Sequence, residues 1–323
     1  MRLIGTTKTT VLLALGAALT LSAQGAKVDE KLPAYRKAAG VTGNLNSIGS
    51  DTLNNLMAFW GEAFTKQYPN VRIQVEGKGS GTAPPALIEG TAQLGPMSRE
   101  MKSEEMDLFE AKYGYKPTRV SVAVDALAVF VHRDNPVESL SLEQLDGIFS
   151  RTFRGGHGDI KTWGQLGVKG DLEGRPISMY GRNSASGTYG YFKETALFKG
   201  DYKDTVKEQP GSSSVVQSVS TDRFAIGYSG CGYLTSGVRA VPLMGIGRDA
   251  AKSFAPTQEH AMSGKYPLSR NLYIYINKPK AGLDPAVREF IKFVLSKEGQ
   301  EIVAKDGYMP LDAKLAAEEL KKL

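Results

Sequence analysis

The sequence contains few of the residues that most often carry covalent or metal chemistry. Of its 323 residues, one is cysteine and three are histidine. The single cysteine, Cys231, excludes an internal disulfide, and we expect it to be a small packed residue rather than a reactive thiol. His132, His157 and His260 lie in unrelated contexts, and none has the spacing of a metal site. We therefore predict neither a metal nor a cofactor.

Common enzyme and nucleic-acid signals are also missing. The chain has no GxxxxGK[ST] phosphate loop, and the segment 227–231 (GYSGC) lacks the second glycine of a nucleophile elbow. The formal net charge is +6, but no block of basic residues dominates it. This charge is typical of a solvated surface that mildly attracts anions. We predict that the protein is not an enzyme and binds no nucleic acid.

Long apolar runs are absent apart from a short one near the N-terminus. Arg2 and Lys8 precede the run from Val11 to Leu21, and small residues follow it at Ser22 and Ala23. This order is typical of a signal peptide, and the run is too short to span a membrane. We predict that residues 1–23 are removed and that the protein is periplasmic; an uncleaved anchor is the alternative.

Three loops rich in serine and glycine each follow a strand-like segment and precede a helix-like one. They are Gly49–Thr52, Gly79–Thr82 and Arg182–Thr188. The first turn of a helix has unpaired N–H groups that can bind an anion, and the guanidinium of Arg182 can bind an oxyanion through two bonds. Together the loops suggest a site around a small tetrahedral anion. Helix capping and a structural ion pair of Arg182 are the simpler explanations.

The apolar pattern predicts an α/β protein. Val71, Ile73 and Val75 alternate as in a strand, whereas residues 53–64 and 287–294 have apolar side chains at helical spacing. The apolar run from Val120 to Val131 predicts one long buried strand. Strands that alternate with helices predict α/β layers with mostly parallel sheets. Because no linker is visible, a chain with two lobes would cross between them more than once.

With these motifs, the chain resembles the periplasmic phosphate-binding subunits of high-affinity phosphate ABC importers. The resemblance covers nearly the whole mature chain and rests on these segments: Gly49–Leu53, Gly79–Thr82, Gly95–Glu100, Arg182–Thr188 and Ala225–Tyr228. It implies a two-lobed type II periplasmic binding protein with the ligand in the cleft between the lobes. We accordingly expect residues 24–122 and 268–323 to form one lobe and residues 123–267 to form the other.

The resemblance also implies a function and a set of phosphate contacts. The protein would capture inorganic phosphate outside the inner membrane and deliver it, as a monomer, to an inner-membrane ABC permease. Arg182 matches the family's guanidinium clamp, and the segment 186–188 matches donors at a helix N-terminus. The expected phosphate-binding residues are Ser50, Asp51, Thr52, Ser80, Ser98, Asp125, Arg182, Ser186, Gly187 and Thr188.

One position departs from the family pattern. Well-known members have an aspartate in the third loop, where it accepts the proton carried by phosphate. Ser98 occupies that position in this chain, and a serine cannot reject sulfate by charge. Asp51 and Asp125 are both candidates for the missing carboxylate, and the sequence does not choose between them. Their simpler roles would be helix capping for Asp51 and hydrogen bonding at the hinge for Asp125.

Three other functions compete with phosphate import. A sulfate or molybdate receptor would bind a similar oxyanion, but a buried carboxylate acceptor argues against it. A secreted phosphoryl-transfer enzyme would need a metal cluster or an activated nucleophile, which the sequence does not show. A secreted phosphate-binding adhesin could use the same fold.

Overall fold

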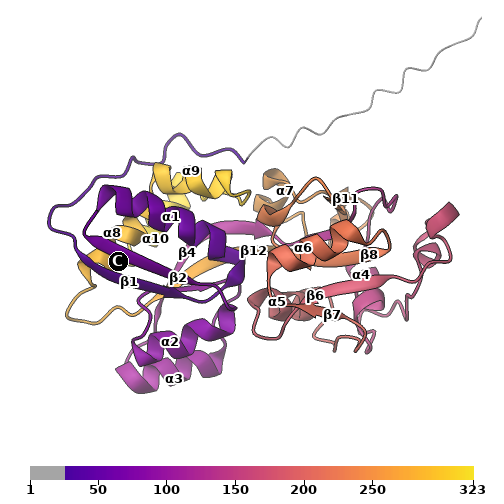
Figure 1. The fold of residues 1–323 in the computed structure, drawn as a ribbon, viewed down its shortest axis with the longest axis horizontal. Helices are drawn as coiled ribbons and strands as arrows, with labels where there is room; N and C mark the ends of the chain where they lie inside the picture. The colour runs from indigo at the N-terminus through magenta and orange to yellow at the C-terminus, as the bar shows by residue number, and fades with distance from the viewer. Residues whose placement is uncertain (1–25) are drawn as a thin grey trace, which may run out of the picture.

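The computed structural model describes residues 26–323, and its strands fall into two groups that form two lobes (Figure 1). The predicted signal peptide, residues 1–23, lies outside the described residues. The strands of the first lobe are β1 (Gly43–Ile48), β2 (Val71–Glu76), β3 (Gly95–Met97), β4 (Thr118–Ala126) and β12 (Ser269–Ile276). The strands of the second lobe are β5 (Ala128–His132), β6 (Ser178–Arg182), β7 (Lys207–Gln209), β8 (Ala225–Ser229), β9 (Val238–Ala240), β10 (Leu243–Met244) and β11 (Ser253–Phe254).

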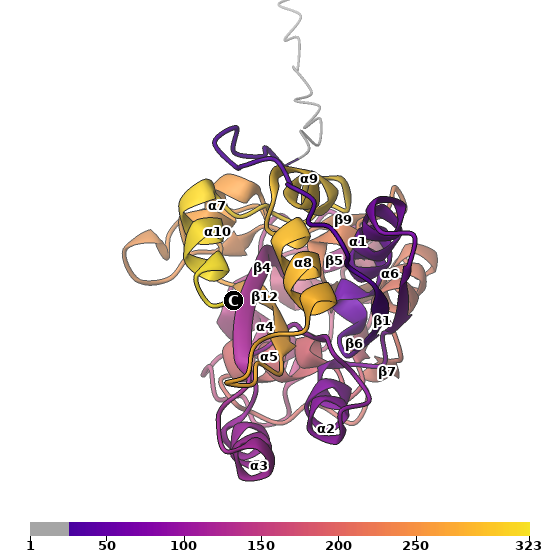
Figure 2. The same ribbon diagram turned by 90° about the vertical axis from the view of Figure 1, so that its left-hand side faces the viewer.

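Helices surround both groups of strands. Those of the first lobe are α1 (Asn54–Gln67), α2 (Ala83–Glu89), α3 (Ser103–Tyr113), α8 (Pro285–Val294), α9 (Lys297–Lys305) and α10 (Ala313–Leu320). Figure 2 views this lobe end-on, with α2 and α3 on the opposite side of the strands from α9. Those of the second lobe are α4 (Leu142–Phe149), α5 (Gly187–Thr195), α6 (Ser212–Thr221) and α7 (Gln258–Met262). No helix in residues 26–323 is long and apolar enough to cross a membrane.

The sheets are mixed, so the prediction of mostly parallel sheets is wrong. β1 pairs with β2 in parallel, and β6 pairs in parallel with both β7 and β8. β12, however, is antiparallel to β3 and β4, and β5 is antiparallel to β8 and β9. The connectivity explains the difference for β4 and β12. The chain leaves the first lobe after β4 and re-enters it as β12, so the two strands must run in opposite directions.

The predicted long strand from Val120 to Val131 is two strands. β4 ends at Ala126 and pairs with β12, whereas β5 begins at Ala128 and pairs with β8 and β9. The single residue between them, Leu127, is fully buried. The apolar run continues across the break because both strands are buried, so hydrophobicity alone gave no sign of the passage from one lobe to the other.

Side chains cap the first turns of α4 and α8. Ser141 and Gln144 form a capping box at the start of α4, with the Gln144 N–H donating to Ser141 Oγ (3.2 Å) and the Ser141 N–H to Gln144 Oε1 (2.9 Å). Asp284 precedes α8, and its Oδ1 accepts from the N–H groups of Ala286 (2.8 Å) and Val287 (3.2 Å). These bonds satisfy donors that have no partner within the helix.

We expect Asp284→Ala to lower the free energy of unfolding by about 1 kcal/mol, the usual cost of removing an N-cap. Urea denaturation followed by circular dichroism measures this change. Asp204→Ala is the matched control, because the Asp204 side chain is 88% exposed and, among residues 26–323, pairs only with the exposed Arg151. If Asp284→Ala lowers the free energy of unfolding no more than Asp204→Ala does, the cap contributes nothing to stability.

Candidate functional site

The predicted site residues come together where the two lobes meet. Those of the first lobe follow β1, β2 and β3, and those of the second lobe lie at the end of β6 and the start of α5. Nearly all of their side chains are buried, as the exposed fractions show: Ser50 2%, Thr52 1%, Ser80 0%, Ser98 0%, Arg182 1%, Ser186 3% and Thr188 0%. We call this set, with Asp51 and Gly187, the interlobe site.

A network of hydroxyl groups forms the centre of the interlobe site. Ser98 Oγ accepts from Ser50 Oγ (3.0 Å) and lies 3.2 Å from Ser80 Oγ, and the Ser98 N–H donates to Ser80 Oγ (3.0 Å). Thr52 Oγ1 and Thr188 Oγ1, from different lobes, are 2.9 Å apart. Hydroxyl groups rotate freely and can both donate and accept. The network can therefore exchange its mutual bonds for bonds to an anion.

Arg182 and Asp51 form an ion pair between the lobes. Arg182 Nη1 lies 3.1 Å from Asp51 Oδ2 and donates to Ser212 Oγ (2.7 Å). Asp51 Oδ2 also accepts from the N–H and the hydroxyl of Ser212, each at 2.8 Å. Burial lowers the pKa of Arg182 below its ordinary value, and Asp51 opposes that shift. Arg182 Nε is buried and has no hydrogen-bond partner in the described part of the chain.

Helix capping was the simpler role considered for Asp51, and its carboxylate does bind a helix N-terminus, that of α6 on the other lobe. Ser212 is the first residue of α6, so the Asp51 carboxylate lies at the positive end of that helix. Ser186 caps α5, where its Oγ accepts from the N–H groups of Thr188 (3.1 Å) and Tyr189 (3.4 Å). A hydroxyl that accepts in this way can still donate its hydrogen to another group.

Asp125 lies beside the interlobe site and pairs with an arginine that the sequence analysis did not identify. Its Oδ2 accepts from Arg270 Nε (3.0 Å) and Nη2 (2.8 Å), and its Oδ1 accepts from the Cys231 N–H (3.0 Å). Neither side chain is exposed to more than 4%. Both oxygens of Asp125 are therefore occupied by protein donors.

The two lobes are in close contact at Gly187. A Cβ atom at this position would lie 2.3 Å from Ser80 Oγ and 2.7 Å from Ser98 Oγ. Nearby, the Gly81 N–H donates to the Ala185 carbonyl oxygen across the same boundary (3.0 Å). Only glycine allows the N-terminus of α5 to approach the first lobe so closely.

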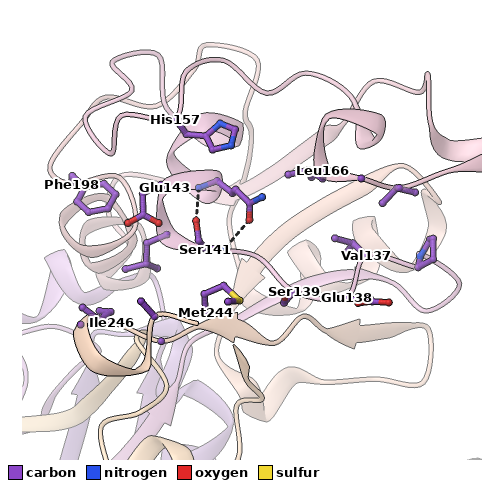
Figure 3. Close-up of a pocket in the computed structure, with 18 of the residues that line it drawn as sticks. Val137, Glu138, Ser139, Ser141, Glu143, His157, Leu166, Phe198, Met244 and Ile246 are labelled. Atoms are coloured by element: carbon purple, nitrogen blue, oxygen red, sulfur yellow. Dashed lines mark hydrogen bonds between the residues drawn. The ribbon is translucent and has the colours of Figure 1, made fainter. Parts of the chain in front are cut away.

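A surface pocket of about 1030 Å³ lies elsewhere, on the second lobe (Figure 3). Glu143, His157, Phe198, Met244 and Ile246 are among its lining residues, and none of the predicted site residues contributes to it. Its wall includes the capping box of α4, whose bonds at Ser141 are dashed in Figure 3. The predicted anion-binding residues therefore lie outside this pocket.

The described residues contain no group of three or more His, Cys, Asp or Glu side chains that could hold a metal ion. Burial raises the pKa of the Cys231 thiol well above its ordinary value, which is typical of a packed cysteine rather than a nucleophile.

Comparison with known proteins decides the family. The PBP superfamily domain matches residues 34–298. The phosphate-binding protein PstS of Pseudomonas aeruginosa is 56% identical over 318 residues, which are 96% of this chain and 98% of that protein. The phosphate-binding protein PstS of Staphylococcus haemolyticus is 31% identical, over 100% of this chain and 96% of that protein. The chain belongs to the PstS family of the PBP superfamily.

Solved structures agree with this assignment. A putative phosphate ABC transporter substrate-binding protein from Clostridium perfringens, with bound phosphate, is 28% identical with a TM-score of 0.71. The similarity covers 84% of this chain and 100% of that one. An ABC-type phosphate transport receptor from Vibrio cholerae is 25% identical with a TM-score of 0.64, over 83% of this chain and 100% of that one. The predicted family and the two-lobed type II fold are confirmed.

The sequence analysis missed two side chains beside the interlobe site, Arg270 and Ser212. Ser212 is the first residue of α6 and follows Gly211 shortly after β7, so this junction is a fourth glycine–serine loop of the kind already recognised. Arg270 stands near the start of β12, a strand whose later residues are almost all buried and apolar. A charged residue in such a strand needs a partner, and this was the signal available for it.

Gly187→Ala should prevent the lobes from closing without unfolding either lobe. With inorganic phosphate added as the expected ligand, small-angle scattering should give a larger radius of gyration for the variant than for the unmodified protein. Gly190→Ala is the control in the same helix, because a Cβ there meets only Arg99 Cδ, at 3.7 Å. An equally compact Gly187→Ala protein would contradict the close approach at this residue.

Proposed function

We propose that this protein binds inorganic phosphate in the interlobe site and delivers it to an ABC permease for import. The observation that carries the proposal is the enclosed set of hydrogen-bond donors that both lobes contribute to one place. It comprises the hydroxyls of Ser50, Thr52, Ser80, Ser98, Ser186 and Thr188, the guanidinium of Arg182 and the first turn of α5. The relative with 56% identity is named a phosphate-binding protein.

Such a site would act by replacing water around the anion. A buried anion is costly unless charges and hydrogen bonds compensate it, and here fixed hydroxyls and an arginine would supply them. Because the donors come from both lobes, phosphate would stabilise the closed arrangement over an open one. Closure would then present a different surface to the permease than the open protein does. No covalent step is part of this function.

Asp51 is the better candidate for the carboxylate that accepts the proton of phosphate. Both oxygens of Asp125 already accept from Arg270 and Cys231. Asp51 uses only Oδ2 in the described contacts, so Oδ1 is available to accept a bond. A carboxylate acceptor would favour phosphate, which carries a proton, over sulfate, which carries none.

The remaining parts of the proposal concern the cell and the chain as a whole. The protein would be exported, with residues 1–23 removed, and would act in the periplasm as a monomer, without a metal and without enzymatic activity. Residues 24–126 and 268–323 would move as one lobe and residues 127–267 as the other, so the first boundary would lie slightly later than the expected residue 122, because β4 continues to Ala126. Mass spectrometry of the protein from an exporting cell tests removal of the N-terminus.

Titration calorimetry with phosphate, and with sulfate as competitor, tests the binding function. We expect tight binding of phosphate and no displacement by sulfate at equal concentration. Tighter binding of sulfate or molybdate would replace this proposal with the oxyanion-receptor alternative. Release of phosphate from phosphate esters by the purified protein would indicate an enzyme instead.

Arg182→Ala should weaken phosphate binding at least about tenfold, because truncation of a buried charged partner typically costs 2–5 kcal/mol or more. Calorimetry measures the affinity, and circular dichroism checks that the fold is retained. Arg151→Ala is the control, since the Arg151 side chain is 56% exposed and pairs with an exposed aspartate. Unchanged affinity in Arg182→Ala would remove this residue from the site.

Asp51→Asn should narrow the ratio of phosphate to sulfate affinity, whereas Asp125→Asn should change this ratio much less. The asparagine at position 51 keeps the shape but loses the charge that repels sulfate, and sites of this kind can discriminate by roughly 10⁴. Competition calorimetry with both anions gives the ratio for each variant. A larger change in Asp125→Asn would assign the proton acceptor to Asp125.

A further inference from the structure

The cross-strand pair Arg270–Asp125 links the lobes at the point where the chain passes between them. Arg270 on β12 lies directly opposite Asp125 on β4, the two strands by which the chain re-enters and leaves the first lobe. In Figure 1 these strands lie together at the junction of the lobes. The Cys231 N–H, from the second lobe, donates to the other oxygen of Asp125 (3.0 Å). Groups of both lobes therefore hold the Asp125 carboxylate in place: Arg270 of the first lobe and the Cys231 N–H of the second.

Arg270 also reaches the interlobe site through its two terminal nitrogens. Nη1 donates to the carbonyl oxygen of Ser98 (2.9 Å), in the loop after β3. Nη2 donates to Thr188 Oγ1 (2.9 Å), in the first turn of α5. One planar group therefore holds a loop of the first lobe and a hydroxyl of the second lobe in fixed relative positions. A guanidinium suits this role because its donors form a rigid fork.

The bond to Thr188 has a fixed direction. Arginine can only donate, so Thr188 Oγ1 must accept from Arg270. The hydroxyls of Thr188 and Thr52, which are 2.9 Å apart, share two hydrogens, and their mutual bond uses one of them. The other hydrogen is left to donate to a third group, whichever of the two hydroxyls carries it. A bond from a cation also polarises the hydroxyl and strengthens it as a donor.

We infer that Arg270 is a positioning residue of the anion site: it acts through the Thr188 hydroxyl and makes the Thr188–Thr52 pair a donor to the bound anion. Asp125 serves this arrangement by fixing the orientation of the guanidinium and balancing its charge. The inference rests on the proposed function, because it assumes that the bound anion is phosphate. Arg270 bonds to Asp125, Ser98 and Thr188, and this role requires no direct contact between Arg270 and the anion.

A double-mutant cycle with Arg270→Lys and Thr188→Val tests the inference. Lysine keeps the charge but not the fork, and valine keeps the shape of threonine but lacks the hydroxyl. Calorimetry with unmodified protein and phosphate comes first: if phosphate does not bind, the proposed function fails before Arg270 is tested. If it binds, Arg270→Lys should raise Kd about tenfold in the native background and less than about twofold in the Thr188→Val background, because coupled residues are not additive.

Ser212→Ala replaces Thr188→Val in the control cycle. The Ser212 hydroxyl bonds with Arg182 and Asp51 and with none of the groups that Arg270 contacts, so its effect should add to that of Arg270→Lys. A merely structural role of Arg270 would lower thermal stability and would act equally in the Thr188→Val and Ser212→Ala backgrounds. Equal effects in the two backgrounds, or native phosphate affinity in Arg270→Lys, would overturn the inference.

Asp125→Asn provides a second route if Arg270→Lys does not fold. It leaves Arg270 in place but weakens the carboxylate that orients it. The same cycle with Thr188→Val should again show a smaller effect on phosphate affinity once the hydroxyl is gone. An effect of Asp125→Asn that is as large without the Thr188 hydroxyl as with it would contradict the inference.

Discussion

The structure of the interlobe site depends on the burial of Arg182. A guanidinium removed from water needs compensation of several kcal/mol, and the second lobe supplies Ser212 and the Pro210 carbonyl but no carboxylate contact to it in the described residues. The compensating charge, Asp51, comes from the first lobe. Parting of the lobes would therefore require water to replace Asp51 around Arg182. Closure of the lobes therefore brings Asp51 to Arg182 and so also compensates the buried charge of this side chain.

Charge balance also explains why the site is so rich in hydroxyls. Arg182 and Arg270 are paired with Asp51 and Asp125 at the junction, so these four side chains sum to no net charge. A phosphate ion would therefore enter an electrically balanced site rather than a strongly positive one. Its charge would be stabilised mainly by dipoles, from hydroxyls that can turn towards the anion and from the first turn of α5.

The sequence predicted the local features of the fold better than its long-range ones. The spacing of apolar residues predicted α1 and α8. The serine and glycine loops before helices identified most of the site residues. Both signals are local, because each depends on residues close together in the sequence. The break at Leu127 could not be seen, since buried strands on both sides of it have the same composition. Arg270 was missed because its partner, Asp125, is 145 residues away along the chain, and only the pairing of β4 with β12 brings them together.

The serine at position 98 is explained by what surrounds it. Its carbonyl oxygen accepts from Arg270, its N–H donates to Ser80, and its hydroxyl accepts from Ser50. A carboxylate in its place would be a third negative charge beside the partly exposed Asp51 and the buried Asp125, with two arginines to balance them. That charge would disfavour any anion unless it were protonated or compensated. With Asp51 already present in the first loop and paired with Arg182, a neutral donor at position 98 keeps the balance. In this chain the carboxylate of the interlobe site is therefore placed in the loop after β1, at Asp51, and the loop after β3 supplies a neutral hydroxyl.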